Sequence, residues 1–464
     1  SYFSVGAGKF IGDVLNIPEY FGLSSEFWAA SIIIIITTLY TVASGLQGVV
    51  WTDLFQGILI FKMIIVVCSF ALSVEIPDFF SVSVPLKDGS FMPLETTKEN
   101  WTSIFPKWVL SFPENSAYSI YNLFGIALLF YLIKVIIEGS AGTGGYMAQR
   151  FFAARSDRDA GLLSLFWIFL LSFRWPFIAA IAVLGISLGF NSGKIINDPE
   201  KVLPTVIFNI LPTGLKGLLV AGLMAAAMST FSSLINSGAS YWVKDIYQEF
   251  INPKASEKKL IWQSRISSVL IVVLGLILAS GIKSINEIWG WLTMGLGAGM
   301  IIPLLLRWYW WRMNGFGFTA GTIFGMSTAI IQKLFYPEAT EYLSFAILIS
   351  FSFAATIIAS LLTTQTPKEI LSNFYLTTRP FGFWKPMRLM ISEESRKNIK
   401  SENRRDIIAI CFALPWQMVL FLTGMTIVLK RFDLFLYLVI ILILLSVGLY
   451  YFWFRNLSKD SRTD

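Results

Sequence analysis

The sequence predicts an all-α polytopic membrane protein, and two observations lead to this fold class. Only 14% of the 464 residues are charged and 55% are hydrophobic, whereas soluble domains carry about 25% charged residues. Apolar stretches of about 20 residues, the length that crosses a bilayer as a helix, also recur along the whole chain. Most of the molecular surface must therefore face lipid.

The apolar stretches predict about eleven membrane-spanning helices. In chain order they cover residues 26–45, 53–75, 118–140, 160–189, 213–246, 263–283, 286–308, 316–335, 341–362, 406–429 and 434–454. The first two spans are joined by ASGLQGVVWTDLFQ, residues 43–56, which we interpret as a tight interhelical turn.

The fifth predicted span is rich in small and hydroxyl-bearing residues from Leu223 to Tyr247. Small residues let neighbouring helices approach closely in a membrane. The segment also carries more oxygen than helix packing requires, at Ser229, Thr230, Ser232, Ser233, Asn236, Ser237 and Ser240. A dehydrated hard cation such as Na⁺ needs oxygen ligands of this kind, so the segment suggests a cation site inside the membrane.

Basic residues concentrate in alternate loops and predict the orientation. The segment 364–405 carries nine of them, and the short loops at 150–158, 254–265 and 307–312 are basic too. The intervening loops, 76–117 and 190–212, contain few lysines for their length. The positive-inside rule then places loop 364–405 and the C-terminus in the cytoplasm. Isoleucine- and lysine-rich loops favour a bacterial inner membrane, the plasma membrane of the cell.

Several classes of function are disfavoured by composition. The two cysteines, Cys68 and Cys411, have no motif spacing, so neither a disulfide nor a metal site is predicted. Histidine is absent, which removes the usual activating base of nucleophilic enzymes and the usual zinc ligand. We expect no enzyme. The net charge of +7 belongs to loops, and we expect a lipid bilayer and a small-molecule solute as partners, with no nucleic acid.

The chain begins SYFSVGAGKF, with no methionine before Met63 and no signal-peptide pattern. We interpret Ser1–Leu15 as the end of an interrupted helix, and we therefore expect an N-terminally truncated fragment.

Four segments resemble the sodium/solute symporter family, with similarity to its sodium/glucose cotransporter-like members. They are ASGLQGVVWTDLFQ (43–56), GTGGYMAQRFFAARSDRDA (142–160), Arg174 within FLLSFRWPF, and AAAMSTFSSLINSGASYWVKDIY (225–247). They occur in the family's order. The resemblance covers about residues 1–310.

The resemblance implies a LeuT-like fold of two inverted five-helix repeats. Residues 1–310 would form the transporter core, from within core helix three to core helix ten, and residues 311–464 would form accessory transmembrane helices around the basic loop. The family's broken first helix, which supplies carbonyl groups to the sodium site, would lie before residue 1.

The same resemblance places a sodium site on the fifth span. The family uses one carbonyl and two adjacent hydroxyls at positions that match Ala226, Ser229 and Thr230. The structural alternative is that these hydroxyls donate to the carbonyl one turn earlier in their own helix, which is common in membrane helices. The implied coupling ion is Na⁺.

The substrate candidates lie around the third span. Lys134 and Glu138 are one helical turn apart inside the membrane, where ionisable residues face the bundle interior or a cavity; a structural ion pair is the alternative. The segment Gly139–Gly145 is either unwound beside a cavity or an ordinary helix end. Sugar-transporting members have Asn or Asp and then Gln at Gly144 and Gly145, so a hexose is disfavoured here.

Two further residues are structural or coupling candidates. Arg174 lies in the middle of the fourth span and is expected to pair with an acid or with backbone carbonyls. Asp53 follows a predicted turn, where a helix-capping role is the default.

The function predicted on these grounds is a Na⁺-coupled secondary active symporter that imports a small polar solute by alternating access. The alternative is a membrane sensor or scaffold that keeps the fold without transport. A membrane-embedded enzyme is the third possibility, and the lack of histidine argues against it.

Overall fold

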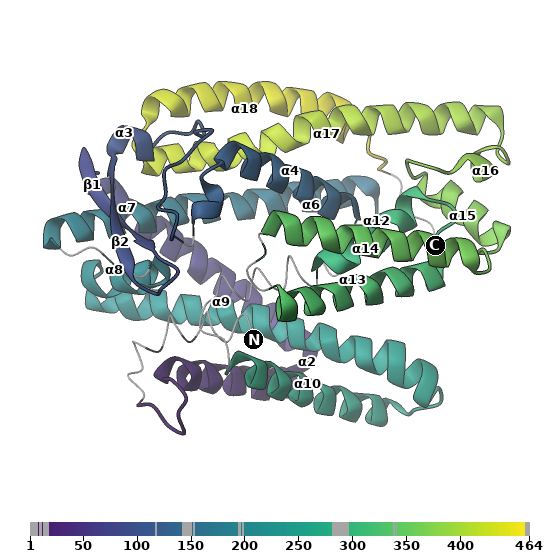
Figure 1. Ribbon diagram of the computed structural model, residues 1–464, viewed down its shortest axis with the longest axis horizontal. Helices are drawn as coiled ribbons and strands as arrows, with labels where there is room; N and C mark the ends of the chain where they lie inside the picture. The colour runs from purple at the N-terminus through teal and green to yellow at the C-terminus, as the bar shows by residue number, and fades with distance from the viewer. Residues whose placement is uncertain are drawn as a thin grey trace.

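The computed structural model describes residues 8, 12, 18–116, 118–141, 151, 154–193, 196, 199–280, 297–336, 339 and 341–459. Long helices lie side by side along the longest axis of the molecule (Figure 1). Within these residues, eight helical segments are long and apolar enough to cross a membrane. The predicted class, an all-α polytopic membrane fold, is confirmed.

The helices are, in order, α2 (Ser25–Ser73), α4 (Phe124–Ala141), α6 (Asp157–Ser172), α7 (Arg174–Ser192), α8 (Val202–Ile210), α9 (Thr213–Ser240), α10 (Glu257–Ala279), α12 (Ala298–Tyr309), α13 (Gly315–Phe335), α14 (Glu341–Leu362), α17 (Glu393–Val428) and α18 (Phe432–Phe452). Most of them follow the predicted spans, whereas α8 lies in the predicted loop 190–212. The predicted span 286–308 falls within the described residues only from residue 297. Three short helices connect them, α3 (Lys98–Trp101), α15 (Lys368–Thr378) and α16 (Lys385–Arg388). The predicted span 160–189 is divided at Phe173 into α6 and α7.

α2 is helical over 49 residues, from Ser25 to Ser73, so the helix break implied by the turn predicted at residues 43–56 is wrong. The chain nevertheless changes direction between the two halves of α2 (Figure 1). Ile33 packs beside Met224 of α9 and Leu59 lies against Gly222 of α9, whereas a straight helix would separate Ile33 and Leu59 by about 39 Å. The halves Ser25–Val42 and Leu54–Ser73 are each long enough to cross a membrane.

The largest apolar core joins α2, α7, α8 and α9. Fully buried side chains from each helix meet there, among them Met63, Leu184, Ile207 and Leu219. Lipid tails are as apolar as these side chains, so the fit between the helices, more than removal of surface from water, holds this part of the bundle together.

A β-hairpin occupies the loop 76–117, where the sequence analysis had predicted no strand. β1 (Phe79–Pro85) pairs antiparallel with β2 (Phe91–Thr97). Gly89 closes the turn with a φ of +84°, a conformation that favours glycine. At the same turn the Ser90 hydroxyl and amide donate to Asp88 (2.6 and 2.9 Å) and lower the pKa of that carboxyl group.

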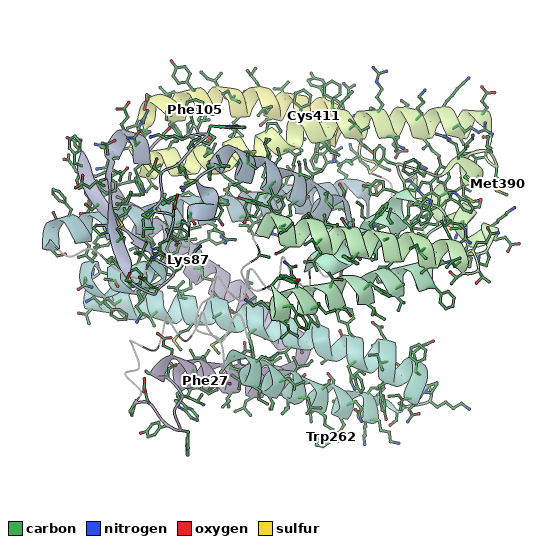
Figure 2. The ribbon with its side chains drawn as sticks, viewed as in Figure 1. Phe27, Lys87, Phe105, Trp262, Met390 and Cys411 are labelled. Atoms are coloured by element: carbon green, nitrogen blue, oxygen red, sulfur yellow. The ribbon has the colours of Figure 1, made fainter. Side chains whose placement is uncertain are left out.

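The hairpin marks one end of the molecule and α16 marks the other. Lys87 lies in the hairpin and Met390 lies beside α16, and the two are far apart along the long axis (Figure 2). We call these the hairpin end and the α16 end. α17 begins at Glu393, well before the predicted span 406–429, and it projects beyond α18 at the α16 end (Figure 1).

The helices α12, α13 and α14 pack with their backbones in contact. A Cβ atom added to Gly325 would lie 2.5 Å from the Cα atom of Gly299, so neither position accepts a side chain. Ser352 of α14 is fully buried, and its hydroxyl is shared between the carbonyl oxygens of Gly299 (2.8 Å) and Gly321 (3.0 Å). One side chain thereby links three helices.

Candidate functional site

α9 carries the predicted sodium site and packs against both α2 and α10. It starts at Thr213 after Pro212 and continues past Ser240 as a π-helix, η3 (Tyr241–Ile251). Ala29 and Ile33 of α2 pack against the methionines Met224 and Met228 of α9. Among the small residues of α9, Gly222 lies against Leu59 and Met63 of α2.

The structure brings two of the three predicted sodium ligands together. The Thr230 hydroxyl donates to the Ala226 carbonyl oxygen over 3.1 Å. Ser229 is half-buried, and its carbonyl oxygen accepts a bond from the Ser232 hydroxyl over 2.9 Å. The hydrogen bond from Thr230 is the structural alternative to a sodium site, in which the hydroxyl donates to the carbonyl oxygen one turn earlier in its own helix. It also holds a hydroxyl and a carbonyl oxygen side by side, and the hydroxyl keeps its lone pairs.

α2 carries a row of hydroxyls that was not predicted from the sequence. Thr37 and Thr41 are buried one turn apart, on the helix face that begins with Ile33. Thr37 donates to the Ile33 carbonyl oxygen (2.7 Å), whereas the Thr41 hydroxyl is buried with no hydrogen-bond partner among the described residues. Nearby, the Tyr40 hydroxyl lies 3.4 Å from the Met228 carbonyl oxygen of α9. The sequence signal that could have predicted this row is the spacing of four residues between two threonines inside an apolar span.

The Lys134–Glu138 pair forms as its spacing predicts. The Lys134 Nζ and Glu138 Oε1 atoms are 2.8 Å apart on α4, and Lys134 is only 7% exposed. α4 packs against α12, where Phe130 and Tyr131 join the core around Leu348. An ammonium group buried in this apolar setting needs its carboxylate partner. The pair is therefore structural at least, and a role in substrate recognition stays a prediction.

The remaining candidates are placed less fully. Arg174 is the first residue of α7, directly after the break at Phe173, and its side chain is exposed. Within the described part of the chain it forms no ion pair with an acid, so the predicted pairing stays a prediction. Gly144 and Gly145 lie outside the described residues, and Asp53 has a described backbone in α2 but no described side chain.

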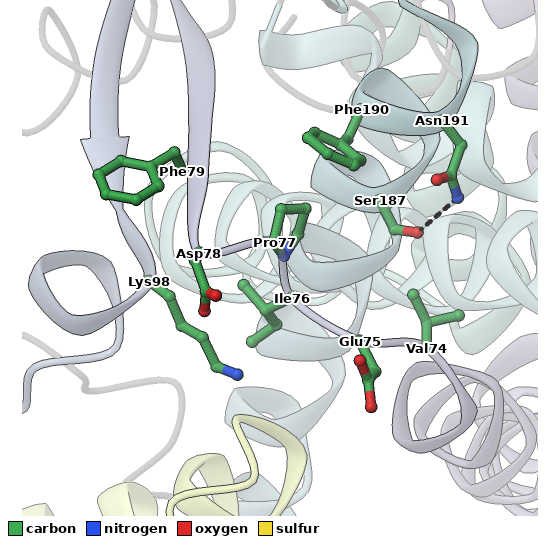
Figure 3. A pocket seen from close by; sticks show the side chains of 10 residues that line it. All are labelled: Val74, Glu75, Ile76, Pro77, Asp78, Phe79, Lys98, Ser187, Phe190 and Asn191. Atoms are coloured by element: carbon green, nitrogen blue, oxygen red, sulfur yellow. Dashed lines mark hydrogen bonds between the residues drawn. The ribbon is translucent and has the colours of Figure 1, made fainter.

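A separate pocket of about 860 Å³ opens at the hairpin end (Figure 3). The chain segment that leaves α2, the hairpin and the last turns of α7 line it, with Glu75, Asp78 and Lys98 as the charged groups. The Asn191 amide donates to the Ser187 hydroxyl on its wall (3.2 Å). None of the predicted site residues lines this pocket, which is a feature of the bundle's end.

Comparison with known proteins identifies the family. The model of the sodium:solute symporter family matches residues 4–325. A sodium/proline symporter of Haemophilus influenzae is 26% identical over 73% of this chain and 64% of its own length. A high-affinity proline transporter of Bacillus subtilis is 27% identical over 70% of this chain and 62% of its own length. A sodium/glucose cotransporter of Vibrio parahaemolyticus is 26% identical over 74% of this chain and 65% of its own length.

The fold has a counterpart among solved structures. A Na⁺-coupled sialic acid symporter in a substrate-bound outward-open state matches with a TM-score of 0.50 and 17% identity, over 79% of this chain and 73% of that one. This likeness confirms the LeuT-like fold predicted from the resemblance. The chain spans less than two thirds of the length of the proline and glucose transporters that it matches. The protein is a multi-pass membrane protein, and it belongs to the sodium:solute symporter family.

Proposed function

We propose that this protein is a Na⁺-coupled symporter that imports a small polar solute by alternating access. The observation that carries the proposal is the Ala226–Thr230 arrangement, in which a carbonyl oxygen and the hydroxyl oxygen of the exposed Thr230 lie 3.1 Å apart on a helix long and apolar enough to cross a membrane. Hard cations take such neutral oxygen ligands. Ala226, Ser229 and Thr230 are the residues proposed to bind Na⁺, and the names of the relatives, sodium symporters for proline and glucose, support the choice of ion.

The coupling is proposed to act through binding free energy. Sodium bound on α9 would favour the conformation that binds solute, and solute would raise sodium affinity by the same factor because linkage is reciprocal. Loss of Na⁺ on the inner side would then weaken solute binding and release it. A sensor that keeps the fold without transport would bind both ligands yet move neither across the membrane.

We propose that the solute is zwitterionic or carries a carboxylate, for example an amino acid or a carboxylated sugar. Lys134 and Glu138 place one charge of each sign 2.8 Å apart on α4. A zwitterionic solute in a cavity beside the pair would replace this ion pair, with its carboxylate on Lys134 and its ammonium group on Glu138. Proline, the solute named for two of the relatives, carries such a pair of charges.

Uptake into proteoliposomes tests the transport proposal directly. The full-length protein should accumulate an amino acid or carboxylated sugar when an inward Na⁺ gradient is imposed, and the same gradient of K⁺ should give none. Efficient sodium-driven uptake of glucose or galactose would contradict the proposed solute class. Solute and sodium binding without accumulation would favour the sensor.

The Glu138→Gln substitution tests the role of the ion pair. We expect the solute affinity measured by competition uptake to fall about tenfold, with a much smaller change in the sodium dependence, because the carboxylate charge is lost while the side-chain shape is kept. Glu114→Gln, at an exposed carboxylate of the hairpin-end loop, is the matched control and should change neither. Unchanged solute affinity in Glu138→Gln would remove the pair from the substrate site.

The proposed topology places loop 364–405 and the C-terminus in the cytoplasm, with the protein in a bacterial plasma membrane. In a background with Cys68 and Cys411 replaced, a cysteine at Ser392 should be labelled by a membrane-impermeant reagent only after the membrane is opened. A cysteine at Ser90, at the tip of the hairpin, should be labelled in intact cells. Labelling of Ser392→Cys from outside would reverse the orientation.

A further inference from the structure

The α16 end carries a surface that is both apolar and basic. Phe383, Leu389 and Met390 are 75%, 61% and 59% exposed, and the exposed cations Lys385 and Arg388 lie between them in the chain. We call these five residues the α16 patch. Met390 lies at the outer edge of the molecule (Figure 2). Large apolar side chains grouped with cations on an exposed surface indicate a partner.

The α16 patch is part of a folded unit. Beneath it, α15, α16 and the start of α17 share a small core made of Leu371, Tyr375, Trp384, Met387 and Ile399. The Trp384 ring packs 5.5 Å from the Phe374 ring and 5.9 Å from the Tyr375 ring. Met387 faces this core while its neighbours Arg388 and Leu389 face outward, so α16 itself orients the exposed side chains.

Two hydrogen bonds to backbone carbonyl oxygens hold this unit against the end of α12. The Phe383 amide donates to the Tyr309 carbonyl oxygen (2.6 Å), and the Trp384 indole donates to the Trp308 carbonyl oxygen (2.9 Å). A Cβ atom added to Gly382, which has a φ of +104°, would lie 2.4 Å from the Tyr309 oxygen, so only glycine permits this approach. The α16 patch therefore lies beside the last turn of the apolar helix α12. The Arg312 guanidinium, just after α12, donates to the Thr363 carbonyl oxygen (2.8 Å) at the end of α14, which is long and apolar enough to cross a membrane.

The same junction contains an apolar pocket of about 330 Å³. Aromatic and aliphatic side chains line it, among them Trp310, Phe374 and Ile370, with one guanidinium group from Arg307. Trp384 closes the wall that it shares with the small core. A hydrocarbon chain beside a negatively charged group matches this lining.

We propose that the α16 patch binds the membrane surface itself and selects anionic phospholipid headgroups. Phe383, Leu389 and Met390 would enter the interfacial region, where aromatic and apolar side chains of amphipathic segments are stabilised. Lys385 and Arg388 would meet the headgroup phosphates, and basic residues at this depth favour anionic lipid. A second protein is the less favoured partner, because the patch lies near the end of α14, a helix long and apolar enough to cross a membrane, where lipid headgroups are present.

Lipid-selective quenching tests this proposal without any measurement of transport. In a background with Cys68 and Cys411 replaced, the full-length protein carries an environment-sensitive fluorophore on Met390→Cys in phosphatidylcholine nanodiscs. Spin-labelled phosphatidylglycerol or spin-labelled phosphatidylcholine is then added at equal mole fraction. We expect quenching by both, with phosphatidylglycerol preferred roughly fivefold for each of the two cations.

Two controls make the result specific. Lys385→Gln combined with Arg388→Gln should abolish the preference for phosphatidylglycerol, and Lys258→Gln combined with Lys259→Gln, at the exposed start of α10, should leave it unchanged. A fluorophore on Asn398→Cys, exposed on α17, should be quenched much less than one on Met390→Cys. Absent quenching at Met390, equal quenching by both lipids, or a preference that survives the double substitution would each overturn the proposal. The quenching measurements do not depend on transport, so they test this proposal separately from the proposed symport function.

Discussion

α9 and the α12–α13–α14 bundle are both rich in small and hydroxyl residues, yet they use them differently. In the bundle, the Ser352 hydroxyl reaches the carbonyl oxygens of two other helices. In α9, Thr230, Ser232 and Ser237 donate to carbonyl oxygens of α9 itself. Hydroxyls that bond across helices fix the helices to one another. Hydroxyls that bond within one helix leave it free to separate from its neighbour, and their lone pairs can still accept a cation.

The largest effect should come from filling the closest backbone contact in the bundle. Gly325→Val should destabilise the protein by about 3 kcal/mol, because its Cβ atom would meet the Gly299 backbone and the helices must part. Thermal unfolding followed by size-exclusion chromatography in detergent measures this. Gly217→Ala on α9 is the control, since nothing lies within 4 Å of its Cβ position. Equal losses for both would mean that glycine content, rather than contact, sets stability.

Removal of the proposed sodium ligands should change ion binding and leave folding intact. We expect Ser229→Ala combined with Thr230→Ala to raise the sodium concentration for half-maximal uptake about tenfold, equivalent to about 1.4 kcal/mol. The unfolding temperature should change little, because the Thr230 hydroxyl donates to a carbonyl oxygen of its own helix. Ser237→Ala, which removes a hydroxyl of the same kind two turns further on, should leave the sodium dependence unchanged. An unaltered sodium dependence in the double variant would remove the site.

Two serines can be compared to measure how much a hydrogen bond between helices contributes to stability. Both Ser352 and Ser232 are fully buried. Ser352→Ala should cost about 1 kcal/mol of stability because two carbonyl groups on other helices lose their partner. Ser232→Ala should cost clearly less, because its partner is the Ser229 carbonyl in the same helix. Similar losses in thermal unfolding would show that the two regions do not differ.

The smallest effect concerns two buried threonine hydroxyls, Thr41 on α2 and Thr322 on α13, that have no hydrogen-bond partner in the described part of the chain. Replacing either by valine removes an unsatisfied polar group of the same shape and should raise stability by up to about 1 kcal/mol. Uptake assays distinguish the two variants. Thr41 lies on the part of α2 that packs beside α9, so Thr41→Val should alter the sodium dependence of uptake, and Thr322→Val should not. A change in uptake from Thr322→Val alone would reverse the comparison.

The features that were predictable from the sequence rest on strong local signals. Charge content and apolar length predict the membrane class, and the spacing of Lys134 and Glu138 predicts their ion pair. The helical backbone of α2 through the change of direction was not predictable in this way, because Gly45 and Gly48 are equally compatible with a turn that breaks the helix. The hairpin was missed because the alternation in FFSVSVP is short and lies in a loop. Thr41 was missed because burial between two helices depends on their packing, which the chain order of residues does not reveal.

The two halves of α2 rest on the same stretch of α9, and this has a mechanical consequence. Ile33 of the first half packs beside Met224 of α9, and Leu59 of the second half lies against Gly222. The last turns of the second half lead directly into Glu75 at the hairpin-end pocket. A displacement of α9 would therefore act on both halves at once, and the second half connects it to the chain segment that lines the pocket.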